Sequence, residues 1–105
     1  MYREVMLNEF SERRRFLLKE ISELQARLSL YERGTLVIQN DYAYIKYYEN
    51  GKTVSKYVGK HLNEVDILEL KRKLKNYHNL QIRIKENNKE LKEIEKLILK
   101  YGGTL

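Results

Sequence analysis

Residues 35–60, TLVIQNDYAYIKYYENGKTVSKYVGK, decide the fold of this 105-residue chain, because they alone alternate apolar and polar side chains with the two-residue period of a β-strand. Asn50-Gly51 lies where a type I′ hairpin turn is favoured, since both central residues of that turn need a positive φ. Asn40-Asp41 supplies a second tight turn upstream. The stretch therefore predicts a three-stranded antiparallel β-meander over about residues 35–58.

The hairpin turn also fixes the pairing of the second and third strands. It places Tyr44 opposite Tyr57 and Ala43 opposite Val58. Because successive side chains of a strand point to opposite faces, the meander has two distinct faces. The apolar face holds Leu36, Ile38, Ala43, Ile45, Tyr47, Val54 and Val58, together with Lys56. The opposite face, called the tyrosine face below, holds Val37, Gln39, Tyr42, Tyr44, Lys46, Tyr48, Thr53, Ser55 and Tyr57.

A helix is predicted on the N-terminal side of the meander, over about residues 8–32. Its apolar residues follow the alternating three- and four-residue spacing of a coiled-coil seam. Gly34 supplies the positive φ at which helices often end.

A longer helix is predicted after the meander, over about residues 64–101, with Asn63 as its N-cap and Gly102-Gly103 as its end. We therefore expect an α+β fold, with two long antiparallel coiled-coil helices flanking a three-stranded antiparallel β-meander. At this length we expect one domain over residues 1–105.

The second helix, at roughly 55 Å, is too long to be covered by the first helix alone. The simplest cover for its C-terminal half is the same helix of a second copy, which predicts a homodimer in which Asn87 fixes the register. The residues of the expected interface are Leu80, Ile84, Asn87, Leu91, Ile94 and Ile98. The alternative is that this half of the helix frays into solvent.

Composition narrows the function classes. The chain has no cysteine, which excludes a disulfide scaffold, a thiolate metal site and a cysteine nucleophile. It has neither an apolar run near the roughly 18 residues of a membrane span nor the apolar core of a signal peptide. We therefore expect no membrane association and a cytoplasmic location.

Catalysis and metal binding have little support. His61, Glu64 and Asp66 are the one cluster that suggests a metal, but capping and the helix dipole already explain acids at a helix start. The chain has no nucleophile elbow and no phosphate-binding glycine loop. We expect no enzymatic activity and no cofactor.

The tyrosine face is the first candidate for a binding site. The formal net charge is +6, and residues 42–75 carry eight basic and four acidic side chains, a balance of +4. Aromatic rings stack on bases, at roughly 1–3 kcal/mol per base, while lysines hold phosphates. The expected binding residues are Tyr42, Tyr44, Lys46, Tyr48, Lys52, Lys56, Tyr57 and Lys60. The alternative is that tyrosine is a good strand residue and that a helix or a partner covers this face.

The segment YAYIKYYENGKTVSKYVGK resembles a pattern of uncharacterised small prokaryotic and mobile-element proteins, in which a Y-x-Y-x-x-Y-x-x-x-G-K-x-x-S-K-Y-x-G-K hairpin lies between charged helices. The matching positions are Tyr42, Tyr44, Tyr47, Gly51, Lys52, Ser55, Lys56, Tyr57, Gly59 and Lys60. More loosely, the segment is similar to the three-stranded arm-binding domain of phage-type tyrosine integrases. That resemblance implies a sheet laid against DNA, although this chain has long helices on both sides of the sheet and no catalytic domain.

Two hypotheses follow, with a third behind them. The first is a non-enzymatic, dimeric nucleic-acid-binding protein that contacts DNA or RNA through the tyrosine face. The alternative is a protein-interaction module, such as a phage- or mobile-element-encoded inhibitor of the anti-CRISPR kind, which docks the same face on an acidic protein surface, since tyrosine is favoured in protein hot spots. The third is a purely structural coiled-coil adaptor.

Overall fold

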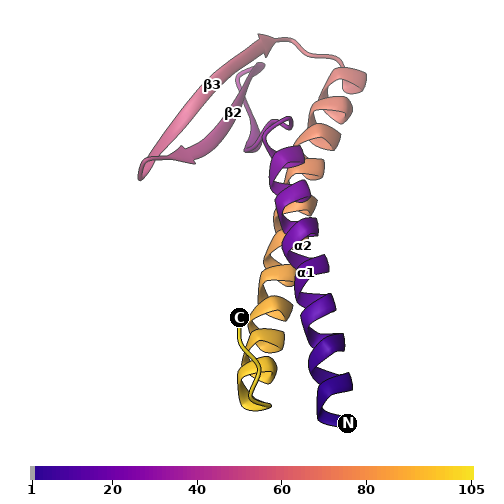
Figure 1. The fold of residues 1–105 in the computed structure, drawn as a ribbon. Helices are drawn as coiled ribbons and strands as arrows, with labels where there is room; N and C mark the ends of the chain where they lie inside the picture. Colours follow the sequence, from indigo (N-terminus) through magenta and orange to yellow (C-terminus); the bar gives the residue numbers. More distant parts are fainter. Residues whose placement is uncertain (1) are drawn as a thin grey trace. The chain divides into compact units, whose positions relative to one another are not determined.

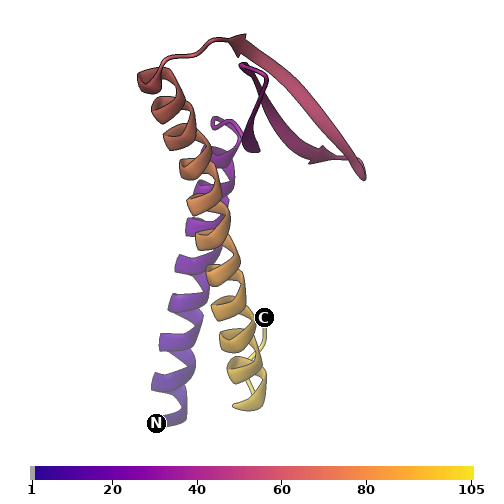
Figure 2. The ribbon, with the colours of Figure 1, turned by 180° about the vertical axis from the view of Figure 1, so that it is seen from behind.

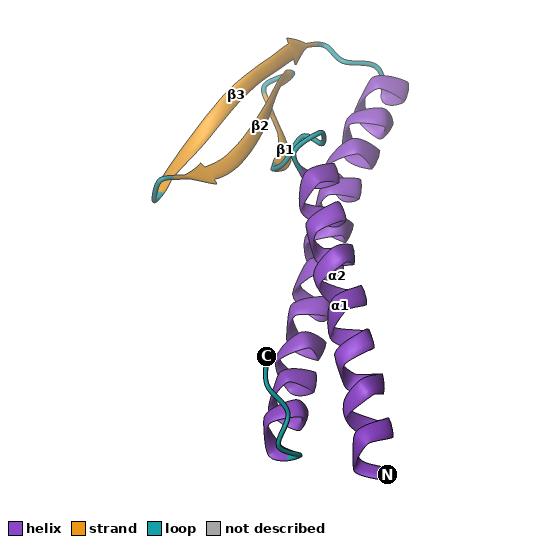
Figure 3. Cartoon of the chain, viewed as in Figure 1, coloured by secondary structure: helices purple, strands orange, loops and turns teal. Residues whose placement is uncertain are grey.

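The computed structural model describes residues 2–105 (Figure 1). The element order is α1 (Tyr2–Leu28), β1 (Thr35–Gln39), β2 (Tyr42–Glu49), β3 (Lys52–Lys60) and α2 (Glu64–Lys100). The three strands form one antiparallel sheet in the order β1-β2-β3, and the two helices flank it along the chain (Figure 3). The predicted α+β fold is therefore confirmed.

The chain forms two compact units. The helical unit contains α1 and Leu80–Leu105, and the sheet unit contains Ser29–Asn79. Helix α2 passes from one unit into the other. Among residues 2–105, no helix combines the length and apolarity that crossing a membrane requires.

Both turns of the meander have the predicted backbone. Asn40 and Asp41 have φ of +50° and +67°, and Asn50 and Gly51 have φ of +52° and +75°. A positive φ at both central residues is the mark of a type I′ turn, whose twist matches that of the strands it joins. The predicted pairing from Glu49 opposite Lys52 to Tyr44 opposite Tyr57 is confirmed.

The last predicted pair of the hairpin is wrong, because a β-bulge intervenes. Ala43 pairs with Gly59 rather than with Val58, and the register shifts between Ala43 and Tyr44. Val58 is therefore the extra residue of β3. Beyond the bulge, Tyr42 pairs with Lys60, so β3 ends at residue 60 and not at about residue 58.

The apolar face of the sheet is buried at its centre. Ala43 and Ile45 are each 1% exposed, and Leu36, Tyr47 and Val54 are half-buried. Ile38, at the β1 end of this face, is 47% exposed. The predicted apolar face is therefore buried in the middle of the sheet and more exposed at its β1 edge.

Helix α1 begins and ends earlier than the predicted residues 8–32. Its first turns are held by tertiary contacts: Leu7 packs against the core of the helical unit, and the Arg3 Nε donates a hydrogen bond to the Tyr101 carbonyl at 2.6 Å. The helix ends at Leu28, so Gly34 is not its stop. Gly34 instead precedes β1, with a φ of +126°.

Helix α2 begins and ends as predicted. The Asn63 Oδ1 accepts a hydrogen bond from the Asp66 backbone N–H at 2.8 Å, which is the expected N-cap contact. At the other end, the Gly103 N–H donates to the Ile98 carbonyl at 2.8 Å, and Gly102 has a φ of +84°. This is a Schellman motif, which pairs the last free carbonyls of the helix.

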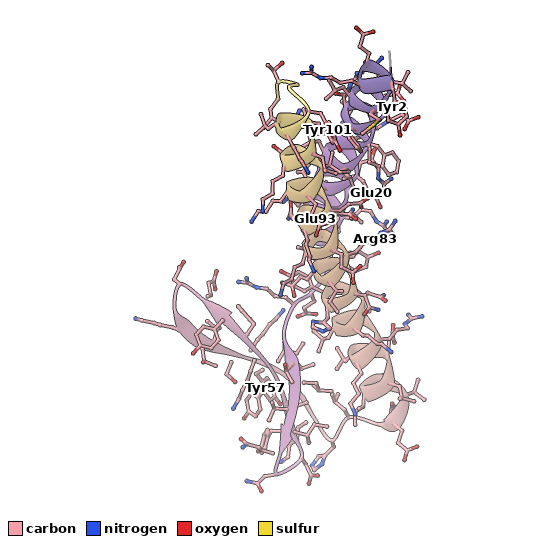
Figure 4. The ribbon with its side chains drawn as sticks, turned by 90° about the horizontal axis from the view of Figure 1, so that it is seen from below. Tyr2, Glu20, Tyr57, Arg83, Glu93 and Tyr101 are labelled. Carbon is pink, nitrogen blue, oxygen red and sulfur yellow. The ribbon has the colours of Figure 1, made fainter. Side chains whose placement is uncertain are left out.

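In the helical unit, α1 and the C-terminal part of α2 lie side by side and antiparallel (Figures 1 and 2). Their core is formed by Leu17, Ile94 and Ile98, with Leu7, Phe10 and Leu91 packed around it. Polar contacts flank the core. The Arg83 Nη2 lies 2.6 Å from the Glu20 Oε1, and the Arg13 Nη2 lies 3.0 Å from the Glu90 Oε1; Glu20 and Arg83 are labelled in Figure 4.

This packing corrects the expected dimer interface. Leu80, Ile94 and Ile98 are 8%, 7% and 1% exposed within the single chain, and Ile84, Asn87 and Leu91 are half-buried. Because α1 starts at Tyr2 rather than at about residue 8, it reaches the end of α2 and covers this seam itself. No second copy is therefore needed to bury this seam. Homodimerisation stays a prediction, but the seam residues no longer support it.

Candidate functional site

The tyrosine face is uncovered within the sheet unit and carries three neighbouring rings. The Tyr44 and Tyr57 ring centroids are 5.8 Å apart in an edge-on arrangement, and those of Tyr42 and Tyr57 are 6.3 Å apart. Tyr57 is 55% exposed and Tyr42 is 36% exposed, whereas Tyr44 is half-buried. Figure 4 shows Tyr57 on the sheet. Strand alternation and pairing therefore bring these rings together, as predicted.

Tyr48 stands apart from that cluster. It is 71% exposed and pairs with Thr53, one pair before the Asn50-Gly51 turn. It shares the tyrosine face but has no ring partner among the described residues. The face thus presents a ring cluster near the end of β3 and a single ring near the hairpin tip.

The bulge gives the cluster a cation that lies past the end of the predicted strand. Because Lys60 pairs with Tyr42, its side chain is on the tyrosine face, and its Nζ lies 4.9 Å from the centroid of the Tyr42 ring. This is cation–π distance. The strand end is held in place by the His61 N–H, which donates to the Asp41 carbonyl at 2.9 Å. Lys60 is therefore a positioned part of the face.

The other predicted lysines are divided between the two sides of the sheet. Lys46 is half-buried and pairs with Ser55, so it shares the tyrosine face. Lys52 is exposed beside the hairpin turn, where it pairs with Glu49.

Lys56 does not join the tyrosines. It pairs with the buried Ile45, and its Nζ donates a hydrogen bond to the Glu32 Oε1 at 3.1 Å. It is therefore on the apolar face, and an acidic partner already holds it. This corrects its assignment as a binding residue of the tyrosine face.

Arg33 was missed by the sequence analysis. Its guanidinium lies over the Tyr47 ring, 4.9 Å from the centroid, and 3.9 Å from the Glu49 carboxylate. Together with Glu32, it ties the segment after α1 to the sheet. The contact depends on tertiary placement, and no local pattern in the sequence signals it.

The suspected metal cluster does not form. Residues 2–105 contain no group of three or more His, Cys, Asp or Glu side chains that could hold a metal ion. The His61 Nδ1 instead lies 3.7 Å from the Asp41 Oδ2, and Asp66 is in the capped first turn of α2.

Together, these features define a class of small α+β protein in which an open, tyrosine-bearing meander lies between two long helices along the chain. A family model described as a domain of unknown function (DUF6788) matches residues 7–67, which is more than half of the chain. The chain belongs to this family. The matched residues include most of α1, the whole meander and the first turn of α2. No curated protein and no solved structure matches the chain.

Proposed function

We propose that this chain is a non-enzymatic nucleic-acid-binding protein that uses the tyrosine face of its sheet. One observation supports this function above the others: the Tyr42, Tyr44 and Tyr57 rings form one cluster on an open face that also carries Lys46 and Lys60. Proteins that bind single strands without sequence preference combine two components: aromatic rings on which bases stack, and nearby cations that bind the phosphates.

Tyr57 is the centre of the proposed site. Its ring touches both neighbours and is the most exposed of the three, so it offers the largest free surface to a base. Lys60 and Lys46 supply positive charge from the same face. Because Lys60 already lies against Tyr42, a bound phosphate would meet a cation whose position is restricted in advance.

The test is a fluorescence anisotropy titration with generic single- and double-stranded DNA and RNA at two salt concentrations. The variants are Tyr57→Val, which keeps a good strand residue, and Tyr57→Val with Lys60→Gln. Since stacking contributes about 1–3 kcal/mol per base, we expect Tyr57→Val to weaken single-strand binding about 5- to 150-fold. The double variant should also show a smaller salt dependence.

Tyr31→Val is the matched control, because Tyr31 is 36% exposed and lies outside the sheet. It should leave affinity unchanged. Wild-type protein that binds no nucleic acid at low salt would contradict the proposal. Single-strand binding that survives the Tyr57 and Lys60 changes would move the single-strand site off the tyrosine face.

The same exposed rings also suit the alternative, a protein partner with an acidic surface. A folded protein without affinity for any of the four nucleic acids would favour that alternative. Homodimerisation is a separate prediction that light scattering measures. Because α1 buries the seam, a dimer mass would require an interface made of other residues.

A further inference from the structure

Helix α2 carries a row of four lysines that the tyrosine face does not use. Lys85, Lys89, Lys92 and Lys96 are spaced by four, three and four residues, so they fall within about 60° of arc on one side of the helix. All four are exposed. The buried residues of the same segment, including Ile94 and Ile98, lie on the opposite side, where the helix packs in the core of the helical unit.

Among the described residues, the lysines of the row have no ion-pair partners, although the segment 85–96 carries four glutamates as well as the four lysines. Glu90 and Glu95 form ion pairs with Arg13 and Arg14 of α1, whereas Glu86 and Glu93 lie three or four residues from Lys89 or Lys96 without pairing with them. Within residues 2–105, none of the four lysines lies at ion-pair distance from a carboxylate. An ordinary solvated helix face alternates charge sign, whereas like charges three and four residues apart repel and destabilise the helix. A polyanion bound along the row would offset that repulsion.

The chemistry of the row favours a phosphate backbone over exposed bases. No aromatic residue lies between Leu80 and Lys100, so this segment has no aromatic ring that can stack on a base. Lysine acts as a flexible point charge that holds phosphates without reading sequence. The row is about 16 Å long, and B-form DNA carries one phosphate per roughly 1.7 Å of its axis, so several phosphates can lie within reach.

A shallow groove in the helical unit lies beside the row. It has a volume of about 820 Å³, and Lys85, Lys89 and Lys92 contribute to its lining together with Glu86, Leu28 and Ile84. Three of the four lysines thus border a depression.

We propose that the lysine row of α2 binds the phosphate backbone of double-stranded nucleic acid, without sequence preference and separately from the tyrosine face. A duplex is the occupant that fits, because it exposes phosphates while its bases stay stacked inside. The helical unit would then hold duplex, and the sheet unit would contact unpaired bases.

The test compares two triple variants that remove the same charge from the helical unit. Lys85→Gln, Lys89→Gln and Lys92→Gln neutralise the row. Arg15→Gln, Lys19→Gln and Arg27→Gln neutralise three exposed cations of α1 that are not in the row. Glutamine is a good helix former, and circular dichroism and thermal unfolding check that both variants fold.

A generic DNA duplex of about 20 base pairs is titrated with each protein at several salt concentrations. The row variant should bind the duplex at least about 10-fold more weakly at low salt. The slope of log K against log salt changes by about 0.9 for each phosphate contact, so the loss of three lysines should make the slope shallower by about 2 to 3. The α1 variant should change the slope by less than about 1.

Equal losses in both triple variants would show a net-charge effect and would overturn the proposal, as would an unchanged slope in the row variant. The Tyr57→Val variant separates this site from the proposed function. It should leave the salt dependence of duplex binding unchanged while it weakens single-strand binding. The experiment can therefore contradict one proposal without contradicting the other.

Discussion

Gly34 allows the chain to enter the sheet beside β2. Its φ is +126°, and a Cβ there would lie 2.7 Å from both the Ile45 Cγ2 and the Lys46 carbonyl oxygen. Ile45 is 1% exposed, so it has little room to move aside. We expect Gly34→Ala to lower the free energy of unfolding by about 1–3 kcal/mol or more in urea denaturation.

The matched control for this change is Gly51→Ala. Gly51 also has a positive φ, +75°, but a Cβ there would meet nothing within 4 Å. This variant carries no steric clash and a smaller backbone strain, since +75° lies nearer the left-handed region that L residues can adopt, and it should therefore lose less stability than Gly34→Ala. Equal losses would mean that backbone conformation alone, and not the close approach to β2, makes glycine necessary at residue 34.

Asn87 is a polar residue in an otherwise apolar seam. It is half-buried, and its Nδ2 has no hydrogen-bond partner among residues 2–105. A buried donor left unpaired costs about 1–3 kcal/mol, so we expect Asn87→Leu to raise the free energy of unfolding by about that amount. The exposed neighbour Asn88 is the control, since Asn88→Leu should change stability by no more than about 0.5 kcal/mol. An unchanged Asn87→Leu midpoint in urea would show that the amide finds a partner in solution.

The start of α2 depends on a single side chain. The Asn63 Oδ1 accepts the Asp66 N–H at 2.8 Å, and alanine cannot replace this bond. Asn63→Ala should therefore lower stability by about 0.5–2 kcal/mol in thermal or urea unfolding. Asn79→Ala, at an exposed position inside the same helix, should be neutral or slightly stabilising because alanine is the better helix former. If both variants behave alike, the cap contributes nothing measurable.

The elements that the sequence predicts correctly are those set by neighbouring residues. A type I′ turn at Asn50-Gly51, a cap at Asn63 and a stop at Gly102 each depend on a few consecutive residues. Strand alternation then assigns Tyr42, Tyr44 and Tyr57 to one face of the sheet. This assignment requires only the position of the Asn50-Gly51 turn, which fixes the pairing of the two strands. The fold class and the centre of the candidate site could therefore be read from local patterns.

The features that the sequence does not predict are set by contacts between distant residues. Gly59 beside Val58 is a local sign of a bulge, but which residue of β3 is left unpaired depends on the pairing with β2. In the same way, α1 ends at Leu28 rather than near residue 32, where Glu32 and Arg33 turn to the sheet and contact Lys56, Tyr47 and Glu49. Two such contacts matter for the site: the bulge places Lys60 beside Tyr42, and Glu32 pairs with Lys56 on the apolar face.

The two units of the chain share one helix, and this has a consequence for unfolding. Residues Glu64 to Asn79 of α2 belong to the sheet unit, and its remaining residues belong to the helical unit. Unfolding one unit would leave its part of α2 without the packing that stabilises long helices in water. We therefore expect the chain to unfold as one cooperative domain, in agreement with the single domain inferred from its length.

Two spectroscopic signals separate the units in this measurement. Far-UV circular dichroism follows the helices, whereas tyrosine fluorescence and near-UV dichroism follow mainly the sheet unit, since Tyr2 and Tyr101 are the only two of the nine tyrosines in the helical unit. In a single cooperative transition both signals have the same urea midpoint. Gly34→Ala, which acts in the sheet unit, should then lower both midpoints together. Two separate midpoints, with only the tyrosine signal moved by Gly34→Ala, would instead show two domains joined by a continuous helix.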